Sequence, residues 1–206
     1  MTKLISQLIA LMIVGITLTR NVNADPLADA QSAYSSGDYA AALELYTPLA
    51  KDGVAKAQLS LGVMYYIGQG VTQSYKDAAK WFQLSAKQGN ALAQNILGEM
   101  YDHGTGVTQS YAEAAKWYRL AAEQGDKNGQ YNLGLMYSRE LGLPLDNVLA
   151  YMWMSMSAKA ADELALLAKH MTPEQVAKAQ ELATQCTANR FQNCTSTTFI
   201  KINTGL

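Results

Sequence analysis

The chain has 206 residues, with 16 Lys and Arg against 17 acidic residues and a formal net charge of -1. Its hydrophobic content of 49% is ordinary and leaves room for one sizeable domain. A chain with neither an excess nor a cluster of basic residues does not suit nucleic acid or an anionic membrane surface, so we exclude both as partners.

The first 24 residues have the pattern of a secretory signal peptide. Lys3 precedes an apolar run, Leu8–Leu18, and Val22-Asn23-Ala24 supplies the small-x-small site that signal peptidases cut. A retained membrane anchor is the alternative, but the apolar run is short for a span. We therefore expect cleavage after Ala24 and a periplasmic or secreted protein with no integral membrane span. Removal of residues 1–24 leaves 14 basic and 17 acidic residues, a charge of -3.

Residues 25–54 are expected to form a degenerate capping repeat. The pattern predicts a short helix over Leu27–Ser35, a break at Ser36-Gly37-Asp38, and a second helix over Tyr39–Lys51. Terminal repeats are atypical because their outer face meets solvent.

Residues 55–162 repeat with a period of 36. The first two units agree at 22 of 36 positions without a gap, and the third fits more loosely. Positions that recur in all three units include Gly62, Gly98 and Gly134, Tyr65, Tyr101 and Tyr137, and Trp81, Trp117 and Trp153. Such a period indicates a solenoid whose neighbouring units bury a shared core, with repeats at 55–90, 91–126 and 127–162.

Each full unit is predicted to be a helix pair. The first helix, Val54–Ile67 in the first unit, carries Gly62 at its centre, where glycine costs about 1 kcal/mol relative to alanine. We infer that another helix crosses there at close range. Gly-x-Gly turns end the first helices, and Ser74 and Ser110 are expected to cap the second ones. The predicted buried side of the first unit's second helix is Ala78, Ala79, Trp81, Leu84 and Ala86.

The unit pattern is A-x-A-Q-x-x-L-G-x-M-Y, then G-x-G-V, Y-x-x-A-x-K-W and A-x-x-Q-G. It resembles the Sel-one-like repeats, relatives of the tetratricopeptide repeats. The resemblance implies an all-α fold, a right-handed α-solenoid of stacked antiparallel helix pairs, and a role in holding proteins together. The third unit keeps the pattern's Gln130, Gly134 and Trp153 but lacks the final glycine.

The period fails after residue 162. Residues 163–186 are expected to be C-terminal capping helices, because Thr172, Pro173 and Gln175 form the start signal of a helix. We expect an irregular tail over 187–206. Cys186 and Cys194 are interpreted as a structural disulfide in an exported protein. A metal site would need two more ligands, and a redox pair usually has C-x-x-C spacing.

No catalytic constellation is present in the sequence, so we expect no enzyme, no cofactor and no metal. Glu99, Asp102 and His103 lie within one helical turn and could be metal ligands, but such a group is more often a solvated helix end. Cysteine-rich relatives have been linked to β-lactam binding or hydrolysis, and this chain lacks their cysteine pair in each repeat.

Positions that differ between the units are free to set binding specificity. On the first helices they share one stripe, opposite the recurrent stripe, and by resemblance this stripe lines the concave side. The candidate protein-binding residues are Leu59, Val63, Tyr66, Asn95, Glu99, Asp102, Tyr131, Leu135 and Ser138. They predict a groove that is apolar at both ends and acidic at its centre. Ordinary surface diversity is the alternative, although clustered apolar residues favour an interface.

The sequence as a whole predicts an exported adaptor or scaffold that binds another protein or peptide segment in a bacterial envelope, with a monomer favoured. An acidic centre predicts a basic centre in the partner segment. The alternative function is a cell-wall (peptidoglycan)-associated binder or a helper of a cell-wall hydrolase.

Overall fold

The computed structural model describes residues 25–191 and Cys194. The predicted signal peptide and the tail over 195–206 lie outside these residues. Within the described part the chain forms ten helices and no strand, which confirms the all-α prediction. The helices are α2 (Pro26–Ser35), α3 (Tyr39–Lys51), α4 (Ala55–Ile67), α5 (Tyr75–Lys87), α6 (Ala91–His103), α7 (Tyr111–Ala122), α8 (Lys127–Arg139), α9 (Asn147–Ser157), α10 (Ala161–Ala168) and α11 (Pro173–Ala188).

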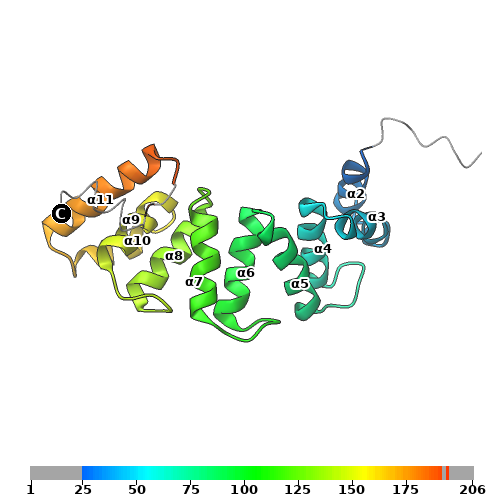
Figure 1. The fold of residues 1–206 in the computed structure, drawn as a ribbon, viewed down its shortest axis with the longest axis horizontal. Coiled ribbons are helices and arrows are strands. Elements are labelled where there is room, and N and C mark those ends of the chain that lie inside the picture. The colour runs from blue at the N-terminus through cyan, green and yellow to red at the C-terminus, as the bar shows by residue number, and fades with distance from the viewer. Residues whose placement is uncertain (1–24, 192–193, 195–206) are drawn as a thin grey trace, which may run out of the picture.

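The helices form a solenoid, as predicted. Each full unit is one pair, α4 with α5, α6 with α7 and α8 with α9, and each pair packs against the next. The pairs follow one another along the long axis of the molecule (Figure 1), with α2 and α3 at one end. At the other end α10 and α11 both pack against α9.

The central glycines of the first helices allow the close approach that the sequence predicts. A Cβ built on Gly62 would lie 2.6 Å from the Phe82 ring, and one on Gly98 would lie 2.7 Å from the Tyr118 ring. At Gly134 it would lie 2.6 Å from Cγ of Met154. In every pair the second helix therefore sends a large side chain onto the glycine of the first.

The predicted helix ends are also confirmed. Gly68 and Gly104 end α4 and α6 in the left-handed region, at φ 83° and 70°. The hydroxyls of Ser74 and Ser110 accept the backbone N–H of Asp77 and Glu113, which are the residues three positions on. These local signals fix where each helix begins and ends.

The prediction for the buried side of α5 is wrong at Leu84, which is 44% exposed, and Trp81 is only half-buried. Phe82 and Ser85 are buried instead. Because Gly62 leaves space for a ring, α5 turns the Phe82 face toward α4. The stripe of buried positions is therefore rotated from the expected one.

The recurrent glutamines join neighbouring units. Gln58, Gln94 and Gln130 are nearly fully buried, and each donates its side-chain amide to the carbonyl of Ala50, Ala86 or Ala122 in the preceding unit. Gln88 and Gln124 in turn donate to Oε1 of Gln58 and Gln94. This glutamine ladder bonds helix carbonyls at three successive unit junctions, from the junction of 25–54 with 55–90 to that of 91–126 with 127–162.

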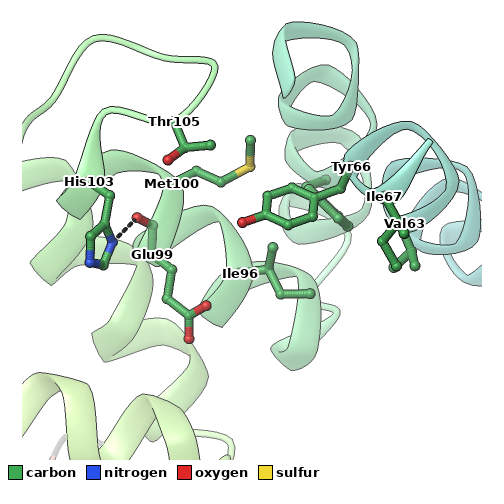
Figure 2. A pocket seen from close by; sticks show the side chains of 9 residues that line it. Val63, Tyr66, Ile67, Ile96, Glu99, Met100, His103 and Thr105 are labelled. Carbon is green, nitrogen blue, oxygen red and sulfur yellow. Dashed lines mark hydrogen bonds between the residues drawn. The ribbon is translucent and has the colours of Figure 1, made fainter. Parts of the chain in front are cut away.

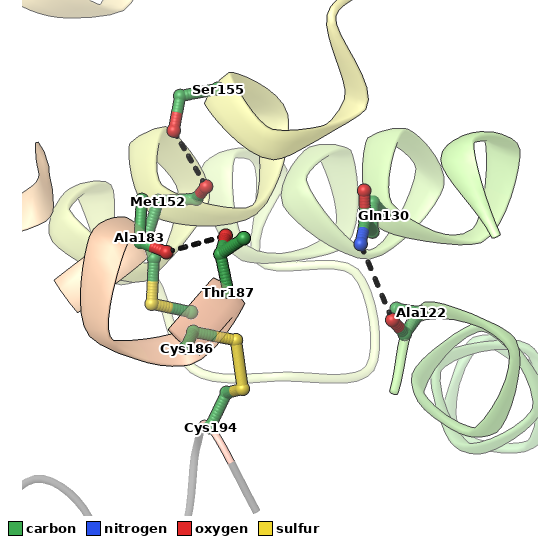
Figure 3. Close-up of a disulfide and its surroundings, with 8 residues drawn as sticks. All are labelled: Ala122, Gln130, Met152, Ser155, Ala183, Cys186, Thr187 and Cys194. Atoms are coloured by element: carbon green, nitrogen blue, oxygen red, sulfur yellow. Dashed lines mark hydrogen bonds between the residues drawn. A yellow bond between two sulfur atoms is a disulfide. The ribbon is translucent and has the colours of Figure 1, made fainter. Parts of the chain in front are cut away.

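A disulfide between Cys186 and Cys194 holds the C-terminal cap, as predicted, with Cα atoms 5.3 Å apart. Both cysteines are fully buried in the cluster that contains Met152 (Figure 3). Helix α11 continues to Ala188, so the first two residues of the expected irregular tail, 187 and 188, are helical. After α11 the chain turns back, and the Phe191 ring packs against Gly125.

Candidate interaction surface

The candidate residues lie on the first helices of the units. We call the surface formed by α4, α6 and α8 the first-helix face. Within it α6 and α8 contact each other directly, so the face is continuous across that junction. The nine predicted residues, however, take up different environments on it.

A groove of about 490 Å³ opens between α4 and α6, and we call it the Glu99 groove. It lies at the junction of units 55–90 and 91–126. Its lining comes from α4, α5, α6 and the turn after α6: Val63, Tyr66, Ile67, Phe82, Ile96, Glu99, Met100, His103 and Thr105. Figure 2 shows Tyr66 reaching from α4 toward α6, the helix that carries Glu99 and His103.

The lining is apolar with a few polar groups, which is the usual character of a binding pocket. Tyr66 and Ile67 remain 38% and 53% exposed. The Tyr66 ring packs edge-on against Tyr75 at 5.0 Å, which supports its position from outside the groove. Nδ1 of His103 lies 2.9 Å from the carbonyl oxygen of Glu99, and this hydrogen bond holds the imidazole at the rim of the groove.

Two amides orient the Glu99 carboxylate. Nδ2 of Asn95 donates to Oε1 of Glu99 at 2.8 Å, and Nδ2 of Asn132 donates to the same oxygen at 3.4 Å. Asn132 also donates to Oδ1 of Asn95 at 3.0 Å. This three-residue network joins α6 to α8 and holds the carboxylate at the edge of the groove.

Asn95 requires a correction. The sequence places it on the exposed stripe, but it is 2% exposed and its amide is committed to Glu99 and Asn132. A polar side chain at this depth is tolerated because both ends of the amide are paired. Asn95 therefore supports the face from beneath it.

Asp102 is outside the lining of the Glu99 groove. Its carboxylate lies 3.5 Å from the hydroxyl of Tyr118, which donates to it, and it is half-buried. Burial, followed by the charge of Asp102, raises the pKa of Tyr118 far above its ordinary value, so the phenol stays protonated. The acidic centre of the groove is thus Glu99 alone. Leu59 is half-buried and packs against two core clusters, so it too faces inward.

A second groove, of about 250 Å³, lies between α8, α9 and α10. Leu135 and Ser138 line it, together with Arg139, Met154, Glu163, Leu166, Leu167 and His170. Beside it the hydroxyl of Tyr131 donates to Oε1 of Glu163 at 2.8 Å. This bond raises the pKa of Tyr131 and lowers that of Glu163. Tyr131 therefore connects α8 to the C-terminal cap.

Sequence reasoning missed several lining residues, most clearly Ile67, Ile96 and His103. Ile67 and His103 occupy the same position in successive units, and Arg139 holds it in the third. Because this position also differs between units, the same signal could have identified it. It lies one helical turn beyond Val63 and Glu99 on the same face.

Among the described residues no three His, Cys, Asp or Glu side chains are grouped closely enough to hold a metal ion. The same part of the chain has no helix with both the length and the apolar character that a membrane span requires.

The solenoid is similar to two solved structures. One is a Sel1 repeat protein from Oxalobacter formigenes, 28% identical with a TM-score of 0.63, where the match covers 84% of this chain and 68% of the other. The second is c5321, a protective antigen present in uropathogenic Escherichia coli strains with an SLR fold. It is 30% identical with a TM-score of 0.65, and the match covers 79% of this chain and 35% of the antigen.

A curated relative is an uncharacterized protein of Neisseria meningitidis serogroup B, 63% identical over 35 residues. That match spans 17% of this chain and only 8% of the relative. The model of the Sel1 repeat matches residues 55–90, 91–126 and 127–162, which together make up more than half of the chain. The chain therefore belongs to the Sel1 repeat family, whose members generally mediate protein–protein interactions and are typically non-catalytic scaffolds.

Proposed function

We propose that the protein is an exported adaptor that binds a segment of a partner protein on its first-helix face, with the Glu99 groove as the anchoring site. The observation that supports this most is the groove itself. It lies between two units of a family that generally mediates protein–protein interactions, and its lining is largely apolar.

The exposed side chains of the groove suit a segment with a bulky apolar residue. Tyr66 and Ile67 expose a large apolar surface, and Tyr is one of the residue types enriched in the binding hot spots of protein–protein interfaces. The close approaches at Gly62 and Gly98 hold α4 against α5 and α6 against α7, and α5 packs against α6, so packed helices support both walls of the groove. The pattern of residues 1–24 supports a location in the cell envelope or outside the cell.

A capture experiment from bacterial envelope extract tests the proposal. The groove variant is Tyr66→Ala with Ile67→Ala, and the matched control is Leu84→Ala with Leu120→Ala. The control residues are 44% and 38% exposed and lie on second helices, so both variants remove exposed apolar area. All three proteins must first show the same helical circular dichroism and thermal midpoint.

We expect the parent and the control to capture the same small set of proteins and the groove variant to lose it. Capture that survives in the groove variant would move the binding site away from this face. Sedimentation of all three proteins with isolated cell-wall sacculi, without protein capture, would favour the cell-wall binder instead. N-terminal sequencing of the exported protein is expected to begin at Asp25.

A further inference from the structure

We propose that the partner segment carries a Lys or Arg side chain next to a bulky apolar residue, and that the cation pairs with Glu99 while the apolar side chain enters the Glu99 groove. This inference rests on the proposed function and specifies the chemistry of the occupant. It begins with the state of the carboxylate before a partner arrives.

One oxygen of Glu99 is occupied and the other is open. Both amide donors, from Asn95 and Asn132, converge on Oε1. Within residues 25–191 and Cys194 no hydrogen bond or ion pair reaches Oε2. Neutral amides orient a carboxylate without cancelling its charge, so its attraction for a cation remains available.

The groove contains no Lys or Arg that could pair with Glu99. Glu99 is the one carboxylate among its nine lining residues, and the His103 ring lies with Nδ1 at the backbone carbonyl of Glu99. A bound apolar group would remove water from around this carboxylate and strengthen its interaction with a neighbouring cation. Charge complementarity therefore selects a basic residue, and the lining beside it selects an apolar neighbour.

The polar network occurs in one unit junction only. In the other two full units the position of Asn95 holds Leu59 and Tyr131, the position of Glu99 holds Val63 and Leu135, and the position of Asn132 holds Ser60 and Ile96. The carboxylate and both of its amide donors are therefore found together at the junction of α6 with α8 and at no other junction of the full units. A network that served only to pack α6 against α8 would not need a negative charge facing the groove, because a glutamine would accept the same bonds.

Glu99→Gln separates these two roles. The variant keeps an oxygen acceptor for both asparagines and loses the charge, so its folding should be unchanged. The probe is a phage-displayed library of random twelve-residue peptides, selected in parallel on the parent, on Glu99→Gln and on Tyr66→Ala. The peptide most enriched by the parent is then synthesised, and its Kd is measured by fluorescence anisotropy at two salt concentrations.

We expect the parent to enrich peptides with Lys or Arg beside a bulky apolar residue. On Glu99→Gln the basic preference should disappear while the apolar preference stays, and the Kd of the chosen peptide should rise about tenfold, with a weaker dependence on salt. Tyr66→Ala should lose the apolar preference.

Two other outcomes would contradict the basic-residue inference, and the second would also contradict binding in the groove. Enriched peptides that need Tyr66 but carry no basic preference would overturn the inference and leave groove binding standing. Peptides indifferent to both substitutions, or no enrichment on the parent, would contradict both proposals.

Discussion

Gly98 lies at the centre of α6, where the Tyr118 ring leaves no space for a Cβ. In an open helix a Gly→Ala substitution stabilises by about 1 kcal/mol. Here the added methyl would meet a ring that is 1% exposed and cannot swing away. The overpacking cost of roughly 1–3 kcal/mol should exceed the helix gain.

Gly98→Ala is therefore expected to lower the free energy of unfolding by up to about 2 kcal/mol, measured by urea denaturation. A double-mutant cycle with Tyr118→Leu provides the control, because the smaller side chain makes room for the methyl. Additive effects of the two substitutions would show that the close approach does not limit this position.

The Tyr131–Glu163 bond gives a local pH dependence. Its hydrogen bond holds the folded pKa of Glu163 below the ordinary value of 4.5, so the stabilisation is present above that pH and is lost as the pH falls through the folded pKa. Tyr131→Phe removes the donor. We expect the stability difference between parent and variant to be largest at neutral pH and to shrink below pH 4.5, in urea denaturation between pH 7 and 3. A difference that is constant over this range would rule out the linkage.

At the scale of the element, the C-terminal cap depends on the disulfide. Cys186 lies in the last turn of α11, Cys194 follows the turn after the helix, and both are fully buried against α9. Replacing both by alanine should lower the free energy of unfolding by roughly 2–3 kcal/mol, because the unfolded chain regains the freedom of the closed loop. Hydrogen exchange should then accelerate in α11 and not in α4 or α6. A reductant added to the parent serves as the control and should reproduce both effects; an unchanged exchange pattern in α11 would contradict this role.

The same scale explains the turns between helices. Gly106 approaches the backbone of Tyr75 in the preceding unit so closely that a Cβ would lie 2.3 Å from the Tyr75 carbonyl oxygen. Gly70 and Gly142 make the equivalent approach to Tyr39 and Tyr111. The second glycine of the two Gly-x-Gly turns, and Gly142 at the same position of the third unit, therefore make contacts between units in addition to shaping the turns.

At the scale of the whole molecule, stability is expected to depend on the junctions between units, as in other solenoids. Gln94→Leu breaks the glutamine ladder at the second junction, because it removes the amide that donates to the Ala86 carbonyl and the oxygen that accepts from Gln124. Losing a buried hydrogen bond costs roughly 0.5–1.5 kcal/mol, and weaker coupling between the units should also broaden the urea transition. The matched control is Gln124→Leu, whose side chain is exposed and which should cost less. Equal effects of the two substitutions would show that the ladder does not couple the units.

The glutamine ladder separates what the sequence predicts from what it leaves open. The recurrence of Gln58, Gln94 and Gln130 is visible as a pattern, and a pattern kept in every unit indicates a shared structural role. Which carbonyl each glutamine bonds depends on how α3, α5 and α7 lie beside α4, α6 and α8, which no single unit specifies. The sequence likewise does not predict the contact of Phe191 with Gly125, because the two residues meet only when α11 packs against α9.

By itself the sequence determined the helices, their ends and their order, because caps, left-handed glycines and helical periodicity act within a few residues. It also determined the close pairing at Gly62, Gly98 and Gly134, since a repeated unfavourable glycine needs a tertiary reason. Only the tertiary structure decided which variable positions face outward. Asn95 is buried because α8 brings Asn132 beside it, and Tyr131 bonds to Glu163 because α10 folds back over α8. The differences between units mark positions that are free to vary, but the junction with the neighbouring unit decides whether such a side chain meets another helix or remains open to a partner.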